Sequence, residues 1–190
     1  MPTPNTTDPR VERSRLLILE AAVRELADRG YGGVTMEGVA GRAGVAKSTI
    51  YRHWSDKLSL IADAFETFHE RLVPDLGAAP VRDSVVMLLG HVADVVADSL
   101  FSRCIPAMIE GAERDPRVRE SFHRYCADRR RALVDLIARG VREGELAPAV
   151  DPGQATIALL GVIFYRRLMT GRPFAAAEAP GLVRSILGPG

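Results

Sequence analysis

A run of hydrogen-bond donors between residues 47 and 53 could contact nucleic acid. Its polar members are Lys47, Ser48, Thr49, Tyr51, Arg52 and His53. Ammonium, guanidinium, hydroxyl and imidazole groups can bind phosphate oxygens and the edges of base pairs. Phosphate contacts would position a protein on a duplex, whereas contacts to base edges would read its sequence. This chemistry requires that the donors lie together on one exposed surface.

Two short helices separated by a glycine are expected to present these donors. The pattern predicts one helix from Met36 to Ala43, capped at its start by the Thr35 hydroxyl and broken by Gly44. A second helix is expected from Ala46 to His53 or Trp54. The apolar residues of the pair are small or branched, as a tight corner requires: Val39, Ala40, Ala43, Val45 and Ile50. This is the outline of a helix-turn-helix, in which the second helix enters the major groove of DNA.

Longer helices are expected on both sides of this pair. An amphipathic helix runs from Val11 to Gly30, with apolar residues at spacings of three and four. A fourth helix begins at Ser55 and Asp56 and carries an apolar stripe: Leu58, Ile61, Phe65, Phe68 and Leu72. Residues 1–8 contain two prolines and no hydrophobe after the start methionine, so we expect a disordered arm. The predicted helix-turn-helix domain therefore spans residues 9–57, and residues 58–73 form a connecting helix.

The segment from Arg10 to about Leu60 resembles the DNA-binding domain of the TetR family of bacterial regulators. The likeness is carried by the Thr, Ala, Gly-Val, Thr-Ile-Tyr and Lys positions within residues 35–57, which occur in the expected order. It implies that three residues touch the phosphate backbone: Thr35, Tyr51 and Lys57. It also implies that five residues face the groove: Lys47, Ser48, Thr49, Arg52 and His53. The expected partner is a double-stranded DNA operator.

Three positions depart from the family pattern. Trp54 stands where the family usually has Phe, which enlarges a core anchor, and Leu58 replaces a common acidic residue. Ala46 lies where Ser or Thr often caps the second helix, a loss worth roughly 1 kcal/mol. Tyr51 is expected to combine a packed ring with a solvated hydroxyl. These departures leave the sequence preference open.

Composition limits the remaining possibilities. The net charge is +1, so a DNA-binding surface must be a local basic patch. Two cysteines and a polar start favour a reducing cytoplasm over a disulfide scaffold. The longest apolar stretch, Ile157–Tyr165, is about half the roughly 20 residues that a bilayer-spanning helix needs, which argues against a membrane role.

Residues 58–190 are expected to form a helical domain for dimerisation and ligand binding. No segment alternates with period two, so the whole chain is predicted to be all-α with about nine helices. The segments Arg114–Val118 and Gly161–Phe174 are similar to one subgroup of TetR-type C-terminal domains. That likeness implies that Gln154–Thr170 and Ala175–Leu187 pair with the same helices of a second subunit. Small residues in the first of these segments, among them Gly161, would allow close approach.

A small-molecule effector, expected to be hydrophobic or aromatic, would bind between the central helices of this domain. The candidate lining residues are Met87, His91, Val95, Met108, Ile109, Phe122, Tyr125, Cys126 and Phe164. Most of them could equally be plain core, and His91 could be a core histidine with satisfied hydrogen bonds. No cofactor is expected.

Other functions find weaker support. Gly38, Gly41 and Gly44 follow no predicted strand, which argues against a dinucleotide-binding loop. Arg129–Arg131 has Asp128 and Asp135 nearby and is expected to be a solvated helix face rather than a second nucleic-acid patch. Cys104, His123 and Cys126 fall short of a zinc signature, and no catalytic grouping is found. An enzyme or a pure interaction module would show no salt-sensitive binding to duplex DNA, whereas a regulator would.

Overall fold

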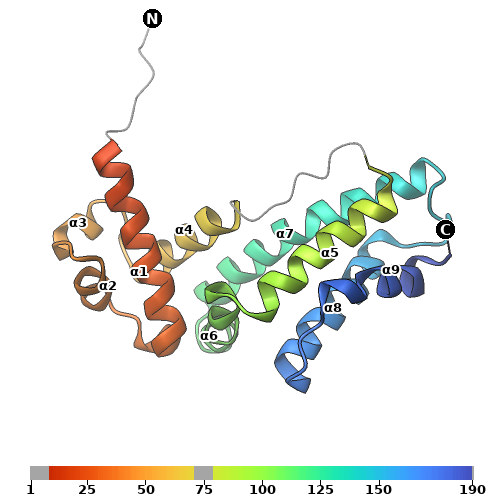
Figure 1. Cartoon of the computed structure of the whole chain (residues 1–190). Coiled ribbons are helices and arrows are strands. Elements are labelled where there is room, and N and C mark those ends of the chain that lie inside the picture. The colour runs from red at the N-terminus through yellow and green to blue at the C-terminus, as the bar shows by residue number, and fades with distance from the viewer. Residues whose placement is uncertain (1–8, 71–78, 190) are drawn as a thin grey trace, which may run out of the picture. The chain divides into compact units, whose positions relative to one another are not determined.

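The computed structural model describes residues 9–70 and 79–189 of the chain. Within these ranges all regular structure is helical, with nine α-helices and no strand, which confirms the predicted all-α fold (Figure 1). The chain divides into two compact units. The first contains described residues 9–70 and 103–122, and the second contains 79–102 and 123–189. The predicted arm over residues 1–8, Leu72 and the side chain of Phe68 lie outside the described part.

The first unit is built around its N-terminal helix. Its four N-terminal helices are α1 (Pro9–Gly33), α2 (Met36–Ala43), α3 (Lys47–Tyr51) and α4 (Lys57–Glu70). Helix α1 packs against α2 and α4, and α2 packs against α3 (Figure 1). The apolar stripe expected on α1 is fully buried at Ile18, Leu19 and Leu26. Burial of this stripe is what holds the short helices in place, since an isolated helix of their length is marginal in water.

Residues 103–122 complete the first unit. They come from α6 (Leu100–Arg114) and the beginning of α7 (Pro116–Arg142). The buried thiol of Cys104 donates to the carbonyl oxygen of Val23 in α1, at 3.4 Å. The Arg117 guanidinium lies 2.7 Å from the Asp56 carboxylate, just before α4. These contacts bring a later part of the chain into the N-terminal unit. The domain boundary expected between residues 57 and 58 stays a prediction.

Two helix ends differ from those predicted. Helix α1 continues to Gly33 but is kinked at Gly30, whose φ of 69° and ψ of 168° are not helical. Helix α3 ends at Tyr51 rather than at His53 or Trp54. The chain turns there because Trp54 points inward: its ring is buried and its Nε1 donates to Asp63 Oδ2 at 2.9 Å. Trp54 is thus the core anchor that the sequence predicts.

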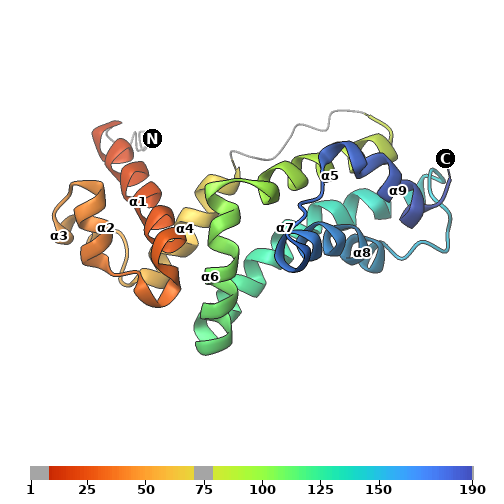
Figure 2. The same ribbon diagram turned by 60° about the horizontal axis from the view of Figure 1, so that its bottom comes forward.

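The second unit contains the part of α7 from residue 123 onward and three complete helices. These are α5 (Val81–Ala97), α8 (Pro152–Tyr165) and α9 (Ala179–Leu187), and α5 contacts both of the others (Figure 2). Asp151 caps α8 by accepting a hydrogen bond from Gln154 N at 2.7 Å. A π-helical turn, Arg166–Thr170, extends α8, and a 3-10 turn, Ala176–Glu178, precedes α9. The two segments expected to dimerise therefore correspond to α8 with its π turn and to α9 with its leading turn.

The burial of Cys104 gives a direct check of the packing between α1 and α6. Burial raises the pKa of its thiol from 9.0 to about 12. At pH 8 the thiolate fraction should therefore be about a thousandfold below that of the unfolded chain, and alkylation should slow accordingly. In a Cys126→Ser variant, a thiol reagent should modify nothing in the folded protein and one cysteine after denaturation. Rapid modification of folded Cys126→Ser would show that Cys104 is not buried.

Candidate DNA-binding surface

The corner between α2 and α3 is fixed by a side-chain cap at the start of α2 and a backbone hydrogen bond at its end. Thr35 caps the start, since its Oγ1 accepts from Gly38 N at 3.0 Å, as the sequence predicts. Gly44 ends the helix in the left-handed conformation, with φ 68° and ψ 32°. That conformation favours glycine, and it lets Val45 N bond to Ala40 O at 3.1 Å. The turn therefore sends α3 off in a defined direction.

The inner side of α3 attaches it to the rest of the unit. Ile50 is fully buried, and the preceding helix contributes buried Val39 and Ala40. Helix α3 has no side-chain cap, because Ala46 occupies the capping position. A helix of five residues without a cap depends on tertiary packing for its existence. Ile50 and Trp54 supply that packing on the inner side.

The opposite side of the motif carries the donors that the sequence singles out. Six of them are exposed: Thr35, Lys47, Ser48, Tyr51, Arg52 and His53. Thr49 and Lys57 are half-buried. Burial of Ile50 orients the surrounding polar residues outward, as a groove-facing helix requires. The roles of the individual residues on DNA stay predictions.

Lys47 and Arg52 differ in how the surrounding protein holds them. Lys47 forms an ion pair with Glu37 of α2, and its ammonium lies 5.5 Å from the centre of the Tyr51 ring. The hydrogen bond from Lys47 lowers the pKa of Glu37, and the same bond raises the pKa of Lys47. Arg52 instead donates to Thr49 Oγ1 at 3.3 Å. Among the described residues, no carboxylate forms an ion pair with Arg52, so its positive charge is available to a ligand.

Lys57 points toward the backbone between α1 and α2. Its Nζ donates to Tyr31 O at 2.9 Å and to Val34 O at 3.4 Å. It also lies 4.5 Å from the centre of the Tyr31 ring. An ammonium group has three donors, so two carbonyl contacts leave one for a phosphate. The sequence does not predict this second task for Lys57.

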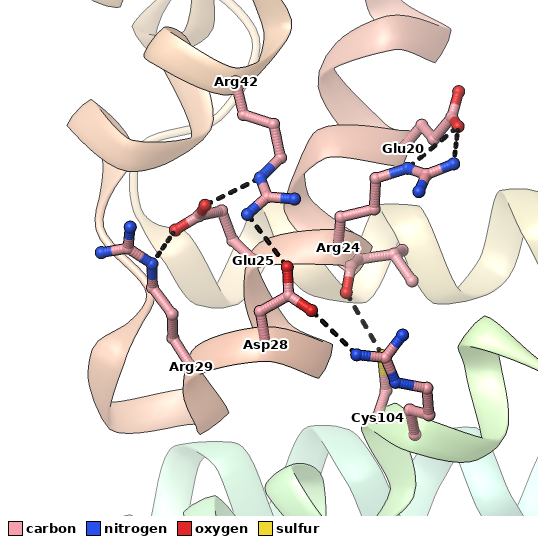
Figure 3. A network of polar contacts seen from close by, with 9 residues as sticks. Glu20, Arg24, Glu25, Asp28, Arg29, Arg42 and Cys104 are labelled. Atoms are coloured by element: carbon pink, nitrogen blue, oxygen red, sulfur yellow. Dashed lines mark hydrogen bonds and ion pairs between the residues drawn. The ribbon is translucent and has the colours of Figure 1, made fainter.

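A buried carboxylate ties α2 to α1. Glu25 of α1 is 2% exposed, and its Oε1 accepts from Arg42 Nε of α2 at 2.8 Å (Figure 3). Its Oε2 lies 3.1 Å from Arg29 Nε. A Cβ at position 38 would come within 2.8 Å of the same Oε2, so the backbone of α2 lies directly against the carboxylate. Glycine at position 38 thus permits the close approach of the two helices.

The same arginine continues the ion-pair network to α6. Arg42 Nη2 lies 3.0 Å from Asp28 Oδ2 (Figure 3). Asp28 Oδ1 lies 2.9 Å from Arg103 Nη2. Asp28 is therefore shared between an arginine of the helix-turn-helix and an arginine of α6. The network connects three helices of the first unit through charge-assisted hydrogen bonds.

Sequence reasoning missed Glu25, Arg42 and Glu37. Glu25 could have been found, because helical spacing from Ala22 places a charge beside the buried stripe of α1. A charge in such a position needs a partner. Arg42 and Glu37 gave no comparable signal, since their partners lie in other helices.

The candidate effector residues are divided between the two units. Met108, Ile109 and Phe122 belong to the first unit, and the remaining six belong to the second. Three of those six lie on one face of α5, at spacings of four: Met87, His91 and Val95. Of the nine candidates, Met108 is buried, Met87 and Ile109 are exposed, and the remaining six are half-buried. Their role in a pocket stays a prediction.

Two further observations concern the described residues alone. Across residues 9–70 and 79–189, no group of three or more His, Cys, Asp or Glu side chains could hold a metal ion. No single helix in these ranges is long and apolar enough to span a membrane, although α5 and α6 together pass the same test of length and composition.

Two family models match the chain. The N-terminal model, described as bacterial regulatory proteins of the tetR family, matches residues 18–64. The C-terminal model, described as a tetracyclin repressor-like C-terminal domain, matches residues 73–186. The first match contains the whole corner from Thr35 to Lys57, and the two together cover most of the chain.

Relatives and solved structures agree with these matches. The chain is 36% identical over 169 residues to the HTH-type transcriptional regulator YdeS of Bacillus subtilis. The aligned region covers 86% of this chain and 82% of YdeS. The fold of this chain is similar to that of Salmonella enterica GusR, with a TM-score of 0.77 and 20% identity. The match covers 96% of this chain and 98% of GusR. It is also similar to Bacillus subtilis FadR in complex with stearoyl-CoA, with a TM-score of 0.76, 20% identity, and coverage of 91% and 97%.

The buried Glu25 predicts an asymmetry among substitutions in the network. Arg42→Ala removes the 2.8 Å partner of a carboxylate that has no access to water, so the thermal midpoint should fall by about 5–10 °C. Asp28→Ala removes an exposed carboxylate from the same arginine and should cost clearly less. Adding Glu25→Gln to Arg42→Ala should recover part of the loss. Calorimetry of the four proteins checks this, and equal shifts for Arg42→Ala and Asp28→Ala would refute it.

Proposed function

The chain belongs to the TetR family of DNA-binding transcriptional regulators, and we propose that it is a dimeric repressor released from its operator by a small apolar effector. Its operator is a pseudo-palindrome, and two copies of α3 read the two halves from adjacent major grooves. The protein has no catalytic role and acts on operator DNA in the cytoplasm.

The observation that carries this proposal is the two-sided construction of α3. One side is anchored by buried Ile50, and the other exposes Arg52 without a carboxylate partner among the described residues. An arginine can donate two parallel hydrogen bonds to guanine in the major groove, which is the commonest specific contact between protein and DNA. Thr35 supports the same orientation: its Oγ1 accepts from Gly38 N, so its hydroxyl proton can be donated to a phosphate.

An exposed apolar face on α8 and its π turn supports the dimer. Ile157, Tyr165 and Met169 have 54%, 63% and 72% of their surfaces exposed. Ile157, Gly161 and Tyr165 follow one another at spacings of four and share one side of α8. A row of large apolar side chains in water favours a protein partner. A second copy of the chain fits best, because a two-fold operator requires a two-fold protein.

The effector is proposed to be apolar because the candidate lining residues are mostly aliphatic or aromatic. Bacillus subtilis FadR, whose fold is similar, forms a complex with stearoyl-CoA, and this supports an effector with a long apolar chain. Preferential binding of the effector to a conformation with weak DNA affinity would shift the population away from the operator.

Selection of duplexes from random DNA by the purified protein tests base reading. We expect the wild type to select a sequence with two related half-sites. Arg52→Ala should lose on the order of 1–3 kcal/mol of binding and relax the preference at one position in each half. Selection of the same sequence with the same affinity would rule out Arg52 as a base-reading residue.

Lys57 should act on all duplexes alike. Lys57→Ala should weaken cognate and unrelated DNA equally and reduce the salt slope of log affinity by about one unit. Lys57→Gln is the matched control, because its amide can still donate to Tyr31 O but carries no charge. An equal reduction in both variants supports a phosphate contact. A slope that stays unchanged in Lys57→Gln assigns Lys57 to the structural contact alone.

Gly161→Glu tests the dimer without disturbing the fold of the subunit. A Cβ at position 161 would meet no atom within 4 Å, so the new side chain has room in the isolated chain. In a dimer, it would bury an unpaired carboxylate between paired helices and should yield monomers with little operator affinity. Gly32→Glu, also in open space, should remain dimeric. Light scattering measures the oligomeric state. If Gly161→Glu remains dimeric, the interface lies elsewhere on the chain. If the wild type is monomeric at micromolar concentration, the proposed dimer is excluded.

A further inference from the structure

An acidic side chain stands among the groups proposed to meet DNA. Glu37 is in the first turn of α2, two residues after Thr35, and its side chain is 64% exposed. It reaches across the corner to form an ion pair with Lys47, the first residue of α3. Glu37 therefore touches the reading helix while lying next to a residue proposed to contact phosphate.

The other acidic groups of this part of the unit are already occupied. The sequence from Thr35 to Lys57 contains two acidic residues, Glu37 and Asp56. Asp56 accepts from Ser59 N at 2.8 Å and lies 2.7 Å from Arg117 Nη2. Glu37 is paired with Lys47, which lies on the proposed reading surface. The Glu37 carboxylate is thus directed at the proposed reading surface, whereas the Asp56 carboxylate is bound by Ser59 and Arg117.

We propose that Glu37 is a specificity-determining residue, which holds Lys47 away from the DNA backbone and so weakens binding to sequences that Arg52 does not recognise. The inference rests on the proposed function, in which this face of α3 meets DNA. For Lys47 to contact a phosphate, it must leave a carboxylate, and that carboxylate must then remain near the phosphate. Lys47 would then exchange the Glu37 carboxylate for a phosphate, and the carboxylate and the phosphate would repel each other.

The consequence differs between cognate and unrelated DNA. Binding to unrelated DNA depends almost wholly on phosphate neutralisation and the release of counterions. A lysine whose charge is already neutralised contributes little to it. Cognate DNA adds hydrogen bonds to base edges from the other groove-facing donors, Arg52 among them, and these do not require release of Lys47 from Glu37. The Glu37–Lys47 pair thus lowers the affinity for unrelated sequences more than the affinity for the operator, which is how an unfavourable contact produces specificity.

Charge states at neutral pH are compatible with this role. The hydrogen bond from Lys47 lowers the pKa of Glu37, so the carboxylate stays ionised throughout the pH range of DNA-binding measurements. The same bond raises the pKa of Lys47. Tyr51 also acts on the pair, and the centre of its ring lies 5.5 Å from the Lys47 ammonium.

Glu37→Gln is the test, because it removes the charge and keeps an amide of the same size. Affinity for an unrelated duplex and for a duplex selected by the wild type should be titrated between 0.05 and about 0.3 M salt. We expect the affinity for unrelated DNA at about 0.1 M salt to rise about five- to tenfold and its salt slope to steepen by about one unit. The selected duplex should gain less, so the ratio of the two affinities falls.

Two further variants isolate the cause. Glu20→Gln removes an equal charge from the pair that Glu20 forms with Arg24 on α1, outside the corner, and should leave both slopes unchanged. Adding Lys47→Ala to Glu37→Gln should return the slope for unrelated DNA to the wild-type value, since the released lysine is then absent. Equal effects of Glu20→Gln and Glu37→Gln on DNA affinity would show that the gain comes from the net charge of the protein alone, which would overturn the inference.

The remaining outcomes separate the inference from the function beneath it. A wild type that binds a selected duplex in a salt-sensitive way, with Glu37→Gln indistinguishable from it, overturns the role of Glu37 and leaves the regulator intact. A Glu37→Gln that loses affinity only for the selected duplex also overturns the inference, because Glu37 would then position Lys47 for base reading. A wild type that binds no duplex overturns the proposed function itself.

Discussion

A helix of five residues cannot hold itself together in water, and the proposed reading surface depends on α3 being held by its surroundings. Ile50 anchors it on the inner side, and the left-handed Gly44 sets its direction. Trp54 ends it by turning into the core, where Asp63 accepts its hydrogen bond. The donors on the outer side are ordered because the inner side is packed. Their geometry is therefore a property of the whole first unit rather than of α3.

Electrostatics reinforces that packing and limits what is left for a ligand. Arg42 is held by Glu25 and Asp28, and Arg103 by Asp28. Lys47 is held by Glu37, and Lys57 by two backbone carbonyls. Most positive charges of the helix-turn-helix thus contribute to its own structure, which fits a net charge of only +1 for the chain. A surface with little unpaired charge should bind DNA weakly unless base contacts add to the affinity.

The sequence predicted the features of the corner that arise from neighbouring residues. The cap at Thr35, the break at Gly44 and the anchor at Trp54 all follow from local residue types, and the structure confirms each one. Contacts between residues of different helices were not predicted, because periodicity indicates which face is buried but not what lies against it. Lys57 illustrates this limit: its side chain was assigned to phosphate alone, yet it also binds Tyr31 O. The candidate effector residues share the limit, since helical spacing places Met87 and His91 on one face of α5 without identifying what that face meets.

We propose that the exposed side of the corner meets DNA. Hydrogen–deuterium exchange tests it most directly, with backbone amides compared in the free protein and in the presence of a duplex selected from random DNA. We expect slowed exchange in peptides covering residues 35–57, where the donors of α2, α3 and the start of α4 lie. Protection absent from these residues and confined to residues 123–142, which contain Arg129–Arg131, would contradict it.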